Sequence, residues 1–243
     1  MARPAGRKTG STAPAPARRP GLRGWVWRVA LGLPVALVLW VAAYAVINPP
    51  TTFYMIGEAR VLGEVEQDWV DADDVSPMLL RAIVAAEDAN FCLHWGFDIA
   101  AIRDAIADGA DRGASTLTQQ VVKNAFLWHG RSWPRKALEG VLTPLVELFW
   151  TKRRILEVYI NVAEFDEGVF GVAAAARHHF NVGPDELTDV QAARLAMVLP
   201  APKLRSASDP DAAQRRRTAA ILDGAQTIAA DGRDDCFDRP AGD

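Results

Sequence analysis

The chain has 243 residues, of which 50% are hydrophobic and 23% charged, and its formal net charge is −3. This length suits one membrane segment and one domain of about 200 residues, and it is too short for a second catalytic domain of ordinary size. The charge is uneven, because residues 1–28 hold seven Lys or Arg and no acidic residue. A basic arm on an acidic body excludes a nucleic-acid-binding surface, which would carry positive charge on the folded domain.

The basic residues belong to a segment, residues 1–24, whose Pro, Gly, Ala and Arg content is typical of a disordered arm. Residues 25–48 are predicted to form a transmembrane anchor, because the stretch from Val29 to Ile47 carries no charge and is long enough to cross a bilayer core of about 30 Å. Aromatic residues mark both of its ends. The basic arm predicts a cytoplasmic N-terminus and a body outside the cytoplasm. A cleaved signal peptide is the alternative, with Ala43-Tyr44-Ala45 as the cleavage pattern, but the long apolar run favours an anchor.

Residues 49–230 are predicted to form one domain, all-α or nearly so, followed by a C-terminal tail at 231–243. Val61 and Val65 allow one short strand in the segment 51–75 that precedes the helices. Ser76-Pro77 is expected to open a helix that runs to about Asn90, with Ser76 as the N-cap. The later helices are predicted at about 97–108, 115–127, 133–150, 152–163, 168–180, 188–199 (with a Thr188–Gln191 capping box) and 210–230.

The two cysteines, Cys92 and Cys236, lack the spacing of a zinc site. Export to an oxidising compartment would permit a disulfide between them. Two unpaired or buried thiols remain equally open on sequence grounds.

Glu87 is the first candidate for chemistry. Leu80, Ile83 and Val84 precede it by seven, four and three residues, which places Glu87 at the rim of an apolar helix face. Desolvation raises the pKa of a carboxyl group in such a place and suits it to act as a general acid or base. A helix-end salt bridge is the alternative.

Two further segments suit an anionic sugar substrate. Small and hydroxyl residues open the helix that begins near Ser115, and amides and a lysine follow at Gln119, Gln120 and Lys123. The run from Arg131 to Glu139 places three cations before a glutamate beside an apolar stripe, and clustered Arg and Lys suit a pyrophosphate. A fourth segment, 152–165, contains Glu157, which we expect to be structural.

In order and chemistry, these four segments resemble the signature blocks of the family 51 peptidoglycan glycosyltransferases, and most closely the monofunctional biosynthetic transglycosylases of outer-membraned bacteria. The resemblance covers roughly residues 53–217 and includes the run Phe126-Leu127-Trp128-His129-Gly130-Arg131-Ser132-Trp133. It implies a lysozyme-like, mainly helical fold near the inner membrane. The implied reaction is inverting polymerisation of lipid II into β-1,4-linked glycan strands with release of undecaprenyl pyrophosphate.

The resemblance also implies the roles of individual residues. Glu87 would be the base and Glu139 the second catalytic glutamate. The positions expected to bind substrate are Phe91, His94, Gly96, Asp98, Ser115, Thr116, Gln119, Gln120, Lys123, Asn124, Arg131, Arg135 and Lys136. No cofactor is required, although a divalent cation such as Mg²⁺ or Mn²⁺ could assist departure of the pyrophosphate. The expected partners are lipid II, the growing strand, membrane lipid and other cell-wall or division proteins, with no nucleic acid.

Three other functions compete with this interpretation. A lysozyme-like hydrolase would also use a glutamate in a helical cleft, but it has no pyrophosphate for the cations to hold. A transpeptidase is disfavoured because Lys8-Thr9-Gly10 lies in the basic arm without a Ser-x-x-Lys motif. A catalytically silent scaffold would be credible if Glu87, Glu139 or Lys123 were missing, and all three are present.

Overall fold

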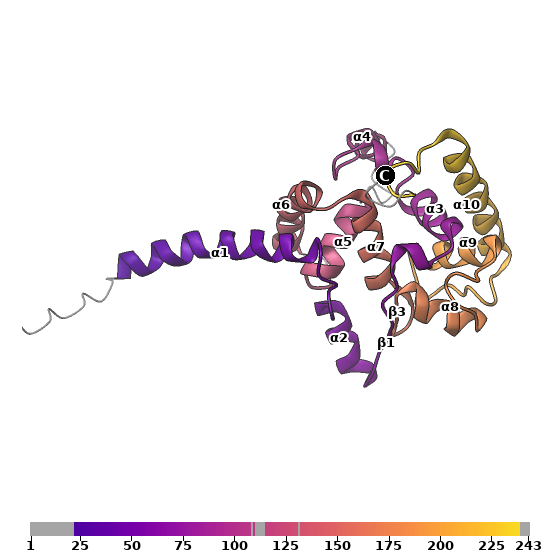
Figure 1. Cartoon of the computed structure of the whole chain (residues 1–243), viewed down its shortest axis with the longest axis horizontal. Helices are drawn as coiled ribbons and strands as arrows, with labels where there is room; N and C mark the ends of the chain where they lie inside the picture. Colours follow the sequence, from indigo (N-terminus) through magenta and orange to yellow (C-terminus); the bar gives the residue numbers. More distant parts are fainter. Residues whose placement is uncertain (1–21, 108, 110–114, 131, 239–243) are drawn as a thin grey trace, which may run out of the picture. The chain divides into compact units, whose positions relative to one another are not determined.

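The structure is a computed structural model that describes residues 22–107, 109, 115–130 and 132–238. The chain divides into two compact units, residues 1–39 and Trp40–Asp243. The described part of the first unit belongs to helix α1 (Leu22–Tyr44), which contains Pro34. The last residues of this helix, Trp40–Tyr44, are counted in the second unit. Among the described residues, one helical segment, Trp25–Tyr44, is long and apolar enough to cross a membrane, as an anchor or a signal sequence would be (Figure 1). The predicted arm lies outside the described residues except for 22–24, which begin α1.

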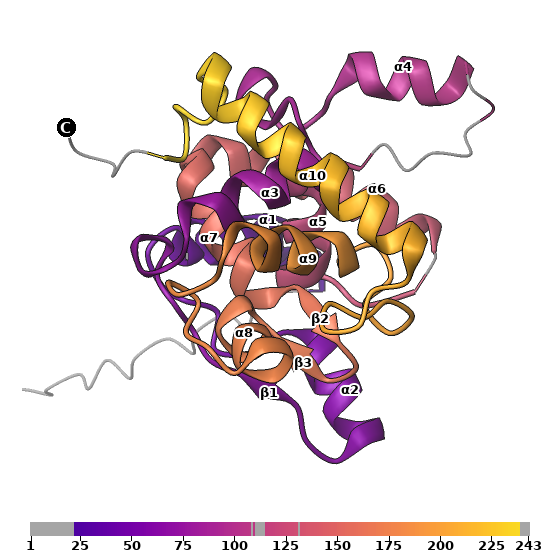
Figure 2. The ribbon, with the colours of Figure 1, turned by 90° about the vertical axis from the view of Figure 1, so that its right-hand side faces the viewer.

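The second unit is predominantly helical, as predicted. Helix α5 lies between α6 and α7, and α3, α9 and α10 pack against one another as a separate group. Figure 2 shows α10 lying across α3 and α9, with α4 at the edge of the domain. The helices are α2 (Phe53–Leu62), α3 (Pro77–Glu87), α4 (Ile99–Ala107), α5 (Leu117–Phe126), α6 (Trp133–Phe149), α7 (Lys152–Val162), α8 (Val172–Phe180), α9 (Asp189–Val198) and α10 (Ala212–Asp231), with 3₁₀ turns at Ala72–Asp74 and Phe91–Leu93.

Three short strands form a small sheet of order β1-β3-β2. Strand β1 (Glu66–Gln67) pairs parallel with β3 (Val169–Phe170), and β2 (Glu164–Asp166) pairs antiparallel with β3. The segment 51–75 contains one short strand, as predicted, but this strand begins at Glu66, and Val61 belongs to α2. The Thr52 side chain starts α2 by accepting a hydrogen bond from the Met55 N–H.

The ends of several helices differ from the predicted ones. Ser76 precedes α3 as predicted, but its side chain makes no capping hydrogen bond. Its backbone N–H donates to the Pro184 carbonyl. Helix α8 begins at Val172 rather than at 168, because residues up to 170 complete the hairpin and Gly171 has a φ of +79°. The Thr188–Gln191 capping box of α9 is confirmed.

Residues 232–238 of the predicted tail pack against the domain. Cys236 forms a disulfide with Cys92, and Phe237 is fully buried. Arg81 of α3 forms ion pairs with Asp234 and Asp238, at 2.6 and 3.0 Å. This segment therefore holds the end of α3 and the turn that follows it, where Glu87 lies.

Candidate active site

Glu87 is the last residue of α3 and has one carboxylate oxygen free. Its Oε2 accepts a hydrogen bond from Gln120 Nε2 at 2.8 Å, whereas its Oε1 is buried and has no partner. Burial raises the pKa of Glu87, and the Gln120 hydrogen bond and the positive charges of Arg217 and Lys123 oppose this effect. A poorly solvated carboxylate with an unused oxygen can accept a proton from a bound hydroxyl group.

The orientation of Gln120 depends on a buried tyrosine. Tyr159 is 1% exposed, and its hydroxyl group donates to Gln120 Oε1 at 3.1 Å. With its oxygen engaged, the Gln120 amide must turn its NH₂ group toward Glu87. Sequence reasoning treated Tyr159 only as a core residue. The available signal was chemical, since a buried tyrosine hydroxyl usually needs a partner.

The N-terminus of α5 carries several predicted substrate-binding residues. Thr116 and Gln119 form a reciprocal capping box, and the Thr116 hydroxyl also donates to the Gly96 carbonyl at 2.7 Å. Asp88 Oδ2 accepts from the Leu117 N–H at 2.9 Å, which ties the end of α3 to the start of α5. Thr116 and Gln119 therefore use their polar groups to position Gln120.

Asp88, His94 and Asp98 form a polar cluster next to Glu87. The two oxygens of Asp88 contact His94 Nε2 at 2.9 Å and the Leu117 N–H. Asp98 accepts from the Ala101 N–H and from Asn90, and these bonds lower its pKa. Each carboxylate oxygen of Asp88 and Asp98 thus has one protein partner, and these contacts fix the orientation of both carboxylates beside Glu87.

The contacts of Phe91 and Gly96 indicate that both residues have a structural role. Phe91 is fully buried, with Lys152 Nζ 4.4 Å from its ring centroid, so its side chain is not available to a substrate. Gly96 has a φ of +83°, and a Cβ atom there would lie 2.6 Å from Thr143 Cγ2. Only glycine fits this position, which brings the 94–98 turn against α6.

The second predicted glutamate is the centre of a cationic group. Glu139 of α6 is 3% exposed, forms an ion pair with Arg135 Nη1 at 2.8 Å and contacts Lys136 Nζ. Burial lowers the pKa of Lys123, and the negative charges of Glu139 and Glu87 oppose this effect. Lys123 and Glu139 also line the same cavity. Three cations around one carboxylate leave the group with an excess of positive charge, which suits a pyrophosphate.

Three cavities that share lining residues border the two glutamates. A cavity of about 450 Å³ is lined by Lys123, Glu139 and Ser115, among others. A second, of about 220 Å³, is lined by Glu87 and again by Ser115. A third, of about 400 Å³, shares Gln120 and Lys123 with the first. Asn124, which also lines the third cavity, has a buried Oδ1 without a partner. Ser115, Gln120, Lys123 and Asn124 are thus placed to meet a substrate, whereas Arg131 lies outside the described residues.

Sequence reasoning missed one side of the third cavity. The Tyr54 ring stacks on His129 with 3.5 Å between the ring centroids, and its hydroxyl group donates to Glu164. Burial lowers the pKa of His129 to about 4, so its ring is neutral near pH 7. His129 was part of a recognised run but had no assigned role. Tyr54 and Glu164 are 110 residues apart, and no local pattern connects them.

Comparisons with known proteins show the family of the chain. The family model described as transglycosylase matches residues 55–226. A biosynthetic peptidoglycan transglycosylase of Jannaschia sp. (strain CCS1) is 59% identical over 216 residues, which cover 89% of this chain and 90% of the relative. The protein of the same description from Pseudomonas entomophila (strain L48) is 51% identical over 201 residues, covering 78% of this chain and 83% of the relative. The protein of the same description from Xanthomonas campestris pv. campestris (strain B100) is 46% identical over 219 residues, covering 86% of this chain and 89% of the relative. The chain therefore belongs to the transglycosylase family.

Proposed function

We propose that the chain is a peptidoglycan glycosyltransferase that polymerises lipid II by inverting transfer, with Glu87 as the general base. The observation that carries the proposal is the buried, unpartnered Oε1 of Glu87, next to an Oε2 that is held by Gln120. In this arrangement Oε1 takes the proton from the 4-hydroxyl group of the acceptor N-acetylglucosamine. The oxygen then attacks C1 of the donor N-acetylmuramic acid, and a β-1,4 bond replaces the α-linked pyrophosphate.

The leaving group defines the role of the cationic group. Undecaprenyl pyrophosphate departs with added negative charge, which Lys123, Arg135 and Lys136 are placed to neutralise around the 450 Å³ cavity. Glu139 holds Arg135 and Lys136 in position through both of its carboxylate oxygens. We therefore assign Glu139 to the donor end of the reaction and Glu87 to the acceptor end. Lys123 lines both the 450 Å³ cavity and the third cavity, and we assign it to the region where the reacting sugars meet.

The cationic group is also what separates this function from glycan cleavage. A lysozyme-like hydrolase needs paired carboxyl groups around its scissile bond and no site for a pyrophosphate. Here the second glutamate is engaged by Arg135 and Lys136, so it is neither a free acid nor a free nucleophile. A silent scaffold would have no need to keep a buried carboxylate oxygen without a partner, which costs free energy.

The N-terminal segment supports a location at the bacterial inner membrane. The span Trp25–Tyr44 follows a basic arm, which orients the N-terminus toward the cytoplasm. The catalytic unit then lies in the periplasm, near the lipid-linked substrate. Exposed Trp128 and Trp133 suit contact with lipid headgroups, and Trp133 lines a surface pocket together with Arg135 and Lys136.

The test is polymerisation of fluorescent lipid II by the full chain in detergent micelles, with products resolved by gel electrophoresis. The expected result is a ladder of lengthening strands that lysozyme digests. Isolated glycan strands without a pyrophosphate serve as the control substrate and should remain unchanged. Shortening of those strands, without extension of lipid II, would favour the hydrolase and contradict the proposal.

A further inference from the structure

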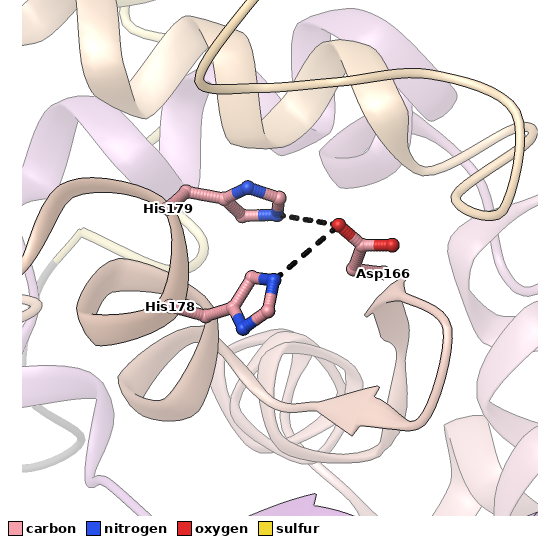
Figure 3. Close-up of side chains that lie close together, drawn as sticks. All are labelled: Asp166, His178 and His179. Carbon is pink, nitrogen blue, oxygen red and sulfur yellow. Dashed lines mark ion pairs between the residues drawn. The ribbon is translucent and has the colours of Figure 1, made fainter. Parts of the chain in front are cut away.

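A second cluster of polar side chains lies outside the catalytic cavities. Asp166 ends strand β2, and His178 and His179 are consecutive residues in the last turn of α8. Figure 3 shows both imidazole rings turned toward the same carboxylate oxygen. His178 Nε2 lies 3.5 Å and His179 Nε2 3.7 Å from Asp166 Oδ2. All three ligand atoms lie within 4.8 Å of one another.

The contacts within the cluster are too long for good hydrogen bonds. An N–H···O bond has its donor and acceptor about 2.7–3.2 Å apart, so Asp166 Oδ2 has no close partner among the two rings. Its other oxygen, Oδ1, accepts from the Glu167 N–H at 2.7 Å, which fixes the carboxylate plane. The His179 side chain is 2% exposed, so water does not readily solvate its Nε2, whose nearest protein acceptor is the Phe165 carbonyl at 3.4 Å.

These spacings are those of ligands around a metal ion. Donor atoms about 2.0–2.2 Å from a tetrahedral Zn²⁺ ion lie about 3.3–3.6 Å from one another, close to the two measured distances. Two imidazole nitrogens and one carboxylate oxygen suit Zn²⁺ and its neighbours in the transition series, whereas Mg²⁺ and Ca²⁺ prefer oxygen ligands throughout. We propose that Asp166, His178 and His179 form a binding site for a divalent transition-metal ion, with Zn²⁺ as the best match.

The exposure of the cluster favours an open site. The side chains of His178 and Asp166 are 41% and 35% exposed, so a fourth ligand would come from solvent. The Asp88–His94–Asp98 cluster shares no residue with this one and differs from it because both of its carboxylates are buried, at 8% exposure each. The two clusters can therefore be separated by mutation.

The site would connect strand β2, which borders the third cavity through Glu164, to helix α8. Asp166 lies two residues beyond Glu164, whose carboxylate accepts from the Tyr54 hydroxyl and from the Gly168 N–H. An ion bound by Asp166, His178 and His179 would link the β2–β3 hairpin to α8. We expect it to stabilise the fold without entering the chemistry at Glu87, since ligand binding to the folded state alone raises Tm.

The experiment uses the full chain without a histidine tag, in detergent micelles. Zn²⁺ is titrated calorimetrically, and the visible absorption of bound Co²⁺ reports coordination by nitrogen ligands. His178→Ala and Asp166→Asn are the test variants, because both side chains are partly exposed and their loss should leave the fold intact. Asp68→Asn is the matched control, since Asp68 is an exposed carboxylate that pairs with Arg177 of the same helix as the two histidines.

The wild-type chain should bind one equivalent of Zn²⁺ at this site and gain several degrees in Tm. Both test variants should lose that equivalent or bind it at least tenfold more weakly, while Asp68→Asn behaves as the wild type. His178→Ala should still polymerise lipid II at the wild-type rate. Failure of the wild type to bind Zn²⁺ at micromolar concentrations would overturn the proposal. Wild-type binding by both test variants, or its loss only in a His94→Ala variant, would equally overturn it.

Discussion

Replacing Glu87 by Gln separates the chemistry of this residue from its shape. The oxygen of the introduced amide can still accept from Gln120 Nε2, and the NH₂ group would occupy the place of the unpartnered Oε1. An amide cannot take a proton from a hydroxyl group. Turnover should therefore fall by about 10²–10⁴-fold, the usual loss for a general base, which corresponds to about 2.7–5.4 kcal/mol in activation free energy.

The same substitution should not destabilise the protein. Burial raises the folded-state pKa of Glu87 above its unfolded value of about 4.3, so folding favours the protonated form. The associated stability is fully present below the unfolded pKa and is lost as the pH rises through the folded pKa. At pH 7 the ionised form of Glu87 thus opposes folding. Glu87→Gln should have an equal or higher Tm at pH 7, and the difference should disappear below about pH 4.

The assay is single-turnover polymerisation of labelled lipid II, because slow product release would conceal a chemical defect. Its rate should fall on the acidic side as Glu87 becomes protonated, with an apparent pKa above about 4.3. Glu157→Gln is the matched control. Glu157 accepts from the Ala72 N–H and pairs with Arg154, so its loss should lower Tm while folded molecules retain activity. Near-normal turnover by Glu87→Gln would refute the assignment of Glu87 as the base.

Three other substitutions test the surroundings of the site. Lys123→Met should weaken binding of a pyrophosphate-bearing donor mimic, measured calorimetrically, by about 1.5–3 kcal/mol, and unchanged affinity would remove Lys123 from the donor site. Tyr159→Phe deletes the hydroxyl group that orients Gln120 at 3.1 Å, so turnover should fall while lipid II binding persists, and a wild-type rate would mean that this bond is dispensable. Replacing Cys92 and Cys236 together by Ser should cost about 2–4 kcal/mol of unfolding free energy in denaturant titrations, and an unchanged midpoint would show that the disulfide adds no stability.

The helices were largely predictable because their signals are local. The Thr188–Gln191 box and the apolar spacing around Leu80, Ile83 and Val84 lie within two helical turns of sequence. The short strand of the segment 51–75 was placed too early because the alternating pattern around Val61 belongs to a helix. That helix begins at a cap from Thr52, and the true strand forms only where β3 is available as a partner.

The sequence by itself determined the apolar N-terminal span and the helical class of the domain, and it indicated Glu87 and Glu139 as candidates, because composition, periodicity and motif order are properties of neighbouring residues. Only the tertiary structure decided how Glu87 is set for chemistry, since Gln120 lies 33 residues from it along the chain and Tyr159 a further 39 residues from Gln120. The pairing of Cys92 with Cys236, 144 residues apart, was likewise left open by sequence. Such contacts depend on how helices pack, and a burial-raised pKa or an unpartnered oxygen exists only once that packing has excluded water.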